Sequence, residues 1–176
     1  MLRGRRALLP GFLNRVPMKE NMLDILMYLF EHCLDSETGT MPNEDLLKGH
    51  LDDAGFHTQD IEKAFVWLDE LASARVHTFR EALISERSIR IYAPQEMARL
   101  DLECRGFLLF LEQTQVLDPV SRELVIDRAM ALESDEIDLP QLKWVILMVL
   151  FNQPGQEAAL AWVEDLLFDE ISEHLH

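Results

Sequence analysis

The fold class is decided by the stretch Asp138-Leu-Pro-Gln-Leu-Lys-Trp-Val-Ile-Leu-Met-Val-Leu-Phe-Asn-Gln-Pro-Gly155. Asp138 and Gln141 have the spacing of a helix-capping box, and the proline between them is tolerated in a first helical turn. The apolar run Trp144–Phe151 continues this helix, and Asn152–Gly155 ends it. Eight apolar residues are far fewer than the roughly 20 that a bilayer requires. The stretch therefore predicts a helix of a folded domain and no transmembrane span.

The rest of the second half is also predicted to be helical. Pro94 opens a helix that continues to about Gln115, and Asp118 caps the next helix, with proline at the first helical position. A last helix is predicted over 156–168. Four helices with short connections predict a four-helix bundle-like lobe over residues 94–170, followed by a tail over residues 171–176.

The first half begins with a strongly apolar helix. Residues Met22–Leu34 are apolar nearly all round, so this helix must be buried on most sides. A second helix is predicted from near Pro42, with Thr40 or Asn43 as its cap, and it ends before Gly55. A third helix opens at Thr58. Two helices joined by a short turn that contains glycine are typical of a helix-turn-helix.

A β-hairpin is predicted after these three helices. The side chains of Ser88–Tyr92 alternate between polar and apolar, which favours a strand, and Val76–Phe79 or Ala82–Ile84 would pair with it. The predicted fold is therefore mostly α, with an N-terminal winged-helix-like lobe (three helices plus a β-hairpin) over residues 22–93. The boundary with the second lobe is predicted near Ala93-Pro94.

Residues 1–21 form a basic segment interrupted by prolines, which we interpret as a disordered basic extension. A misassigned start is the companion interpretation, since Met18 and Met22 offer later starts. A basic anchor at a membrane surface is the alternative.

The charge of the chain is strongly acidic. Lys and Arg total 16 against 32 Asp and Glu, which gives a net charge of −16. The first 22 residues hold five cations and one acid, which leaves 11 cations and 31 acids, a net charge of −20, in residues 23–176. Nucleic-acid binders usually carry the opposite sign, because their affinity comes mainly from neutralising phosphates. Such a charge also serves simply to keep a cytosolic protein soluble and monomeric.

Catalytic, cofactor-binding and metal-ligating residues are not predicted from any motif. The two cysteines, Cys33 and Cys104, are interpreted as buried free thiols in a reducing cytoplasm, with a disulfide or a metal pair as the alternative. A nucleophilic Cys104 whose pKa is lowered by Arg105 is a further alternative.

Asp101 and Arg105 have the i, i+4 spacing of an ion pair on a helix. Gly106 inside this helix costs about 1 kcal/mol relative to Ala, so we expect another helix to approach it closely.

A cluster of arginines lies in the predicted hairpin. Residues 75–92 carry a net charge of +2, and the candidate partner-contact residues are Arg75, Arg80, Arg87 and Arg90. The third helix, over Thr58–Ala74, instead has a net charge of −3. The alternative is that these arginines pair with acids of the protein itself.

Five strings resemble the bacterial Smg family and span roughly Met22 to His176. They are Met22-Leu-Asp-Ile-Leu-Met-Tyr-Leu-Phe-Glu31, Arg90-Ile-Tyr92, Cys104-Arg-Gly-Phe-Leu-Leu-Phe-Leu-Glu112, Val125-Ile-Asp-Arg128 and Leu142-Lys-Trp-Val-Ile-Leu-Met-Val-Leu-Phe-Asn-Gln-Pro-Gly155; the terminal Leu175-His176 also fits. This family has no established activity, no assigned catalytic residues and no known cofactor, so the resemblance carries no functional residue over to this chain.

The predicted function is a non-enzymatic protein-interaction module, an adaptor or regulator in the cytoplasm. The alternative is a nucleic-acid-associated module that uses the basic wing Arg75–Arg90 or acts as an acidic mimic of DNA. A third hypothesis, an enzyme of unfamiliar type, requires a polar pocket with perturbed carboxylates.

Overall fold

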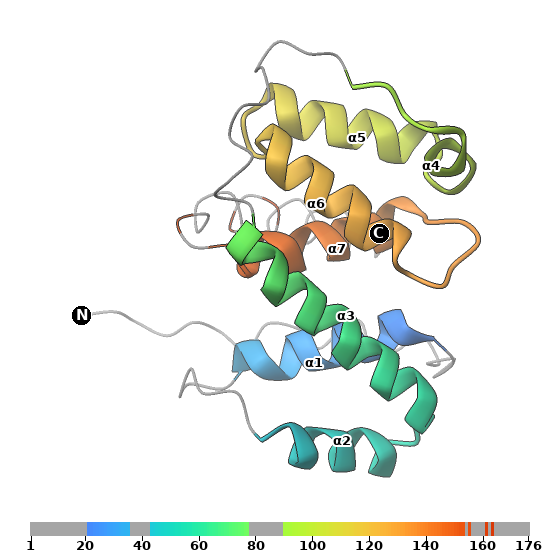
Figure 1. The fold of residues 1–176 in the computed structure, drawn as a ribbon, viewed down its shortest axis with the longest axis vertical. Coiled ribbons are helices and arrows are strands. Elements are labelled where there is room, and N and C mark those ends of the chain that lie inside the picture. The colour runs from blue at the N-terminus through green and yellow to red at the C-terminus, as the bar shows by residue number, and fades with distance from the viewer. Residues whose placement is uncertain are drawn as a thin grey trace, which may run out of the picture. The chain divides into compact units, whose positions relative to one another are not determined.

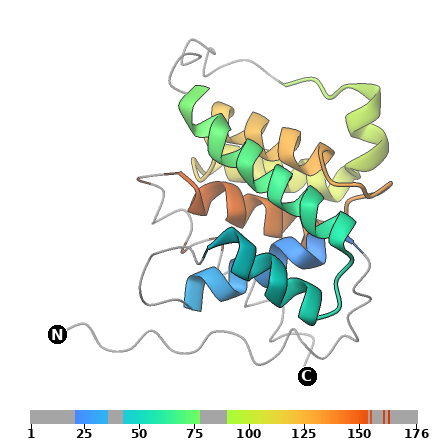
Figure 2. The same cartoon turned by 60° about the horizontal axis from the view of Figure 1, so that its bottom comes forward.

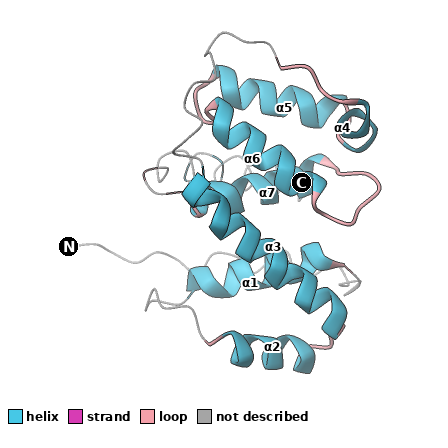
Figure 3. Ribbon diagram, in the orientation of Figure 1, coloured by secondary structure: helices cyan, strands magenta, loops and turns pink. Residues whose placement is uncertain are grey.

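A computed structural model of the protein describes residues 21–35, 43–77, 90–153, 155, 161 and 163. This part of the chain is mostly helical and contains no β-strand (Figures 1 and 3). Its helices are α1 (Met22–Asp35), α2 (Glu44–Asp53), α3 (Thr58–His77), α4 (Pro94–Arg99), α5 (Leu102–Gln113), α6 (Pro119–Met130) and α7 (Leu139–Phe151). None of the described helices is long and apolar enough to cross a membrane.

The chain divides into two compact units, Met1–Phe65 and Val66–His176. The division lies inside α3, so this helix contributes residues to both units. The predicted lobe boundary near Ala93-Pro94 stays a prediction.

The first unit has a core of apolar side chains from α1, α2 and the beginning of α3. The side chains of Ile25 on α1 and Leu51 on α2 are fully buried. The rings of Tyr28 and Phe56 meet edge to face with their centroids 5.8 Å apart, which fixes α1 against the turn between α2 and α3. The buried apolar residues of this unit are Met22, Leu23, Ile25, Leu26, Leu29, Phe30, Leu51, Phe56, Ile61 and Ala64.

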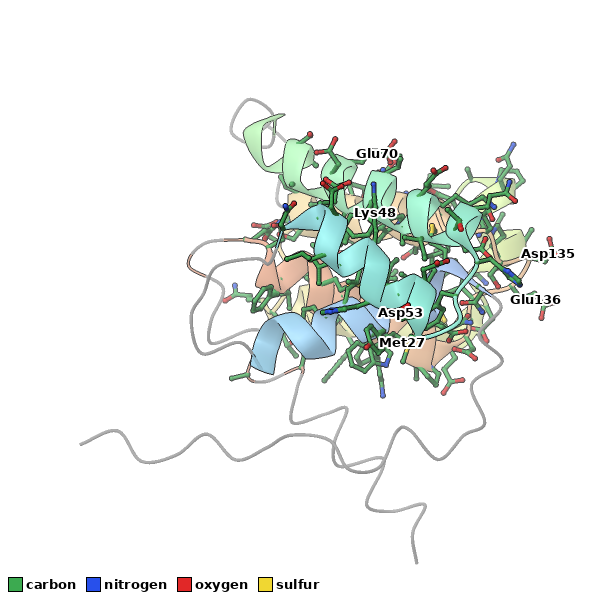
Figure 4. All side chains as sticks on the ribbon, turned by 90° about the horizontal axis from the view of Figure 1, so that it is seen from below. Met27, Lys48, Asp53, Glu70, Asp135 and Glu136 are labelled. Carbon is green, nitrogen blue, oxygen red and sulfur yellow. The ribbon has the colours of Figure 1, made fainter. Side chains whose placement is uncertain are left out.

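The two helices of the predicted helix-turn-helix are confirmed as helices. The side chain of Asn43 accepts a hydrogen bond from the amide of Asp45 and caps α2, as one of the two predicted caps. Gly55, in the turn, has a φ of 90°, a backbone conformation that glycine adopts cheaply. Lys48, labelled on α2 in Figure 4, pairs with Glu44 at 2.7 Å and lies over the ring of Phe65.

The second unit is built around α7. Nine consecutive residues, Leu142 to Leu150, are buried, and α7 packs against α5 and α6, which also contact each other (Figures 1 and 2). The predicted capping box is confirmed: the carboxylate of Asp138 accepts from the amide of Gln141 at 2.8 Å, and the Gln141 side chain accepts from the amide of Asp138 at 3.1 Å. The predicted cap of α6 is confirmed as well, since Asp118 accepts from the amide of Ser121.

The C-terminal half of α3 is attached to α6 and α7 by specific hydrogen bonds. The indole N–H of Trp67 donates to the carbonyl oxygen of Arg128 at 3.0 Å. The side-chain amide of Asn152 donates to the carbonyl oxygen of Leu71 at 3.1 Å. The guanidinium of Arg128 in turn pairs with Glu70 (labelled in Figure 4) at 2.6 Å. Three polar contacts thus fix this half of the helix within the second unit.

The single helix predicted from Pro94 to Gln115 is wrong, because α4 and α5 are separate. Leu100 leaves the helical conformation and forms a parallel bridge with Ile137. The carboxylate of Asp101 then accepts from the amide of Cys104 at 2.7 Å and starts α5 as its N-cap. Arg105 donates to the backbone oxygen of Asp101, and the two charged side chains also attract each other, as their i, i+4 spacing predicts.

The β-hairpin of the predicted winged helix is not supported. Residues 76 and 77 are the last residues of α3, and Arg90–Tyr92 form no strand. The alternation in Arg90-Ile91-Tyr92 has a different cause: Arg90 and Tyr92 are partly buried, whereas Ile91 is 88% exposed. Several predicted segments lie outside the described residues. They are the rest of the predicted hairpin over 78–89, the extension before Asn21, the tail over 171–176, and the predicted last helix except for residues 161 and 163.

Candidate interaction surface

The helix α5 has a buried inner face. Cys104, Leu108 and Leu111 are fully buried, and they follow the spacing i, i+4, i+7 of one helical face. This face points toward α6 and α7, which both contact α5. The inner face therefore accounts for the stability of α5 in the second unit.

The opposite face of α5 is apolar as well, although it is open to solvent. Leu102 is 79% exposed, Leu109 53% and Phe110 44%, and Gly106 is also exposed. These four residues have the spacing i, i+4, i+7, i+8, so they share one side of the helix. We call them the outer face of α5.

Exposed apolar residues are concentrated in this part of the second unit. Of the eight large hydrophobic residues that are exposed in the described part of the chain, five lie between residues 91 and 110. They comprise Ile91, Met97 and the three large residues of the outer face. Scattered exposed apolar side chains are ordinary, whereas the three on one side of α5 form a group that makes this face the candidate interaction surface.

Gly106 lies in the middle of the outer face, and the fold does not require it to be glycine. A Cβ atom built on Gly106 would meet no atom within 4 Å, so the close helix expected from the sequence is not found around it in the described structure. Glycine inside a helix costs about 1 kcal/mol relative to alanine. The protein thus has a residue that weakens the helix in the middle of an exposed apolar face, with open space above it.

Replacing Gly106 with Ala should raise the free energy of unfolding by about 0.5–1 kcal/mol, because alanine favours the helix and has room for its methyl group. Urea denaturation of the purified chain measures this change. The control is Gly155→Ala, which should destabilise the protein because Gly155 has a φ of 83°. A destabilised Gly106→Ala variant would show that this glycine serves the fold itself.

Arg90 is held by two carboxylates of its own unit. Its guanidinium donates to Glu96 at 2.6 and 2.8 Å and to Glu123 at 2.8 and 3.0 Å, and it also lies over the ring of Tyr92. Hydrogen bonding to Arg90 holds the pKa of Glu96 below its usual value. Burial opposes the charge of Glu123, but the hydrogen bonds from Arg90 and Arg122 outweigh it and lower the pKa of this carboxyl.

Arg122 extends this network from α6 to α5. Its side chain is only 6% exposed and bonds to Glu123 at 2.8 Å and to Glu112 on α5. Burial opposes its charge, but the bonds to the two carboxylates outweigh burial and raise the pKa of the guanidinium. The two arginines and three glutamates therefore join α4, α5, α6 and the segment before α4.

The four predicted partner-contact arginines are not brought together in the described residues. Arg90 pairs with Glu96 and Glu123. This agrees, for this one arginine, with the alternative that the arginines pair with acids of the protein itself. Arg75 lies in α3, with its side chain outside the described part, and Arg80 and Arg87 are outside it altogether. A shared contact surface of these residues stays a prediction.

Cys104 is poorly suited to nucleophilic chemistry. It is a free thiol with no exposed surface, as predicted, and its Sγ donates to the carbonyl oxygen of Ile137 at 3.3 Å. Burial, with a smaller contribution from Asp101, raises the pKa of this thiol to about 12, so it stays protonated at neutral pH. Within the described residues, no group of three or more His, Cys, Asp or Glu side chains is arranged to hold a metal ion.

Sequence reasoning missed the outer face of α5. The run Phe107–Leu111 is apolar without interruption, so its periodicity gives no sign of which residues face solvent. The one usable signal is Gly106, which indicates close approach by another helix but not whether that helix belongs to the same chain.

Comparisons with known proteins place the chain among relatives of similar length. A family profile described as "Protein of unknown function (DUF494)" matches residues 22–176. The "Protein Smg homolog" of Nitrosococcus oceani is 57% identical over 159 residues, which cover 90% of this chain and 100% of the relative. The proteins of that name from Xanthomonas oryzae pv. oryzae and Stenotrophomonas maltophilia are 52% and 51% identical, with the same coverage. No solved structure matches the chain.

Proposed function

Because this chain belongs to the Smg family, as its resemblance predicted, and that family is described as one of unknown function, we propose a function from its surface. The protein is a non-enzymatic interaction module of the cytoplasm, an adaptor or regulator, and it binds another protein through the outer face of α5. The observation that carries this proposal is the exposure of Leu102, Leu109 and Phe110 around a glycine that the fold does not require.

The charges of the chain favour a protein partner over a nucleic acid. The net charge of −16 repels phosphate, and Arg90, the one arginine of the predicted wing with a described side chain, is already bonded to Glu96 and Glu123. An apolar helix face suits a protein partner, because its side chains leave water when they pack against apolar side chains of another protein. The proposal does not depend on a winged-helix fold.

Site-specific photo-crosslinking in the host cell tests this function. A photoreactive phenylalanine analogue is placed at position 109 on the outer face, and the matched control carries it at position 46. Leu46 is a suitable control because it is also an exposed leucine on a helix, 60% accessible on α2.

We expect one discrete protein adduct from position 109 and a weak, diffuse background from position 46. The adduct is identified by mass spectrometry and should also form with the purified partner. The same background from both positions would contradict the proposal, because it would show that the outer face has no partner in the cell.

A further inference from the structure

We propose that the outer face of α5 receives an amphipathic helix of a partner protein, whose apolar side chains are flanked by Lys or Arg and whose backbone comes closest at Gly106. This inference rests on the proposed function and deepens it by naming the kind of partner. It is carried by three features of the described structure: the shape of the face, the glycine at its middle and the charges at its border.

The shape of the outer face fits a helix. Leu102, Gly106 and Phe110 form one i±4 row along a 12-residue helix, which is about 18 Å long, with Leu109 beside it. Such a row packs into the groove between rows on a second helix. A helical partner reads a face of this kind with apolar residues at i, i+3, i+4 and i+7. An extended strand is a poor fit, because the backbone groups inside α5 already bond to one another and offer no sheet edge.

Gly106 determines how close the partner helix comes. Two helices normally pack with their axes 8–10 Å apart, and small residues at the crossing allow the shorter separations. Leu102 and Phe110 lie four residues on either side of Gly106, so apolar side chains border the space that the glycine leaves. A backbone that crosses α5 at Gly106 would contact both of them.

The border of the outer face is acidic at its N-terminal end. Glu103 is exposed and lies three residues before Gly106 and seven before Phe110, on the same side of the helix. Asp101, whose carboxylate caps the helix at the amide of Cys104, is exposed at its first turn. Arg105 is turned toward Tyr92, with its guanidinium 5.8 Å from the ring centroid. A cationic border on the partner complements these acids and the net charge of −16.

A second copy of the chain is a poorer occupant of this face. Two copies would each bring a net charge of −16, which opposes their association. A basic amphipathic helix brings positive charge instead, so its charge favours association with this acidic chain.

Binding of synthetic peptides to the full chain tests this inference by fluorescence anisotropy. The first peptide is a helix of about 18 residues with Leu along one face and Lys on both flanks. The second has Glu in place of every Lys, and the third has Ser in place of every Leu. We expect the Leu and Lys peptide to bind, and each of the other two to bind at least about tenfold more weakly.

Two variants map the binding to the outer face. Gly106→Leu should weaken binding of the Leu and Lys peptide at least about tenfold, because the added side chain fills the space at the crossing. Leu46→Ser, which changes an exposed leucine of α2, should leave it unchanged. Circular dichroism with thermal melting checks that both variants remain folded, and we expect Gly106→Leu to fold because its Cβ meets no other atom.

Equal binding of the Lys and Glu peptides would overturn the inference, and so would unchanged binding by a folded Gly106→Leu variant. A dimer of the purified chain that Gly106→Leu dissociates would overturn it in favour of a second copy. If position 109 crosslinks to a discrete protein but the Leu and Lys peptide does not bind, only this inference fails. If position 109 gives no specific adduct, the proposed function fails with it.

Discussion

Changing Leu108 to Ala should lower the free energy of unfolding by about 3 kcal/mol. Leu108 lies on the inner face of α5 and has no exposed surface, so the shorter side chain would leave a cavity against the neighbouring helices. Substitutions of buried leucine by alanine cost about 2–5 kcal/mol, through lost burial and through the cavity itself. Urea denaturation followed by circular dichroism measures the difference.

The neighbouring residue provides the matched control. Leu109 differs from Leu108 only in the side of the helix on which it lies, and it is 53% exposed. Leu109→Ala should therefore change the free energy of unfolding by no more than about 0.5 kcal/mol. Similar losses from both substitutions would show that the outer face of α5 is packed inside the protein, and the proposed interaction surface would not exist.

Replacing Arg122 with Met should destabilise the protein by about 2 kcal/mol at neutral pH. The substitution leaves Glu112 without its Arg122 partner and leaves Glu123 with Arg90 alone. Loss of one member of a fully buried ion pair costs about 3–5 kcal/mol. The smaller value expected here reflects partial solvation, because the side chains of Glu112 and Glu123 are 25% and 41% exposed.

This loss should depend on pH in a defined direction. The pKa of Glu123 is lowered in the folded protein, so its contribution to stability is complete above the value of about 4.3 expected in the unfolded chain. That contribution is lost as the pH falls through the lowered pKa of the folded state, while the arginine stays charged. The difference between wild type and Arg122→Met in urea should thus be full at pH 7 and smaller below about pH 4. A difference that does not change with pH would contradict the ion-pair account of Arg122.

Several elements of the fold were predictable from local sequence. The caps Asn43, Asp118 and Asp138 mark the starts of three helices, because a short polar side chain satisfies amides that the first turn leaves open. The burial of α7 follows from its apolar run, and the burial of Cys104 from its apolar neighbours. Local chemistry decides these features, so a single sequence contains the information.

Features that depend on distant residues were not predictable. The break between α4 and α5 is fixed by pairing of Leu100 with Ile137, which is 37 residues further along the chain. The alternation at Arg90-Ile91-Tyr92 arises from bonds to Glu96 and Glu123 and not from a neighbouring strand. The outer face of α5 was missed for the same reason, since only the packing of α6 and α7 decides which of its apolar residues remain exposed.

The most direct measurement of the central claim is photo-crosslinking from position 109 in the host cell, compared between the wild-type background and Gly106→Leu. The account predicts one discrete adduct in the wild-type background and its loss in a folded Gly106→Leu protein. It would be contradicted by an adduct of equal yield in both backgrounds, or by no specific adduct in either.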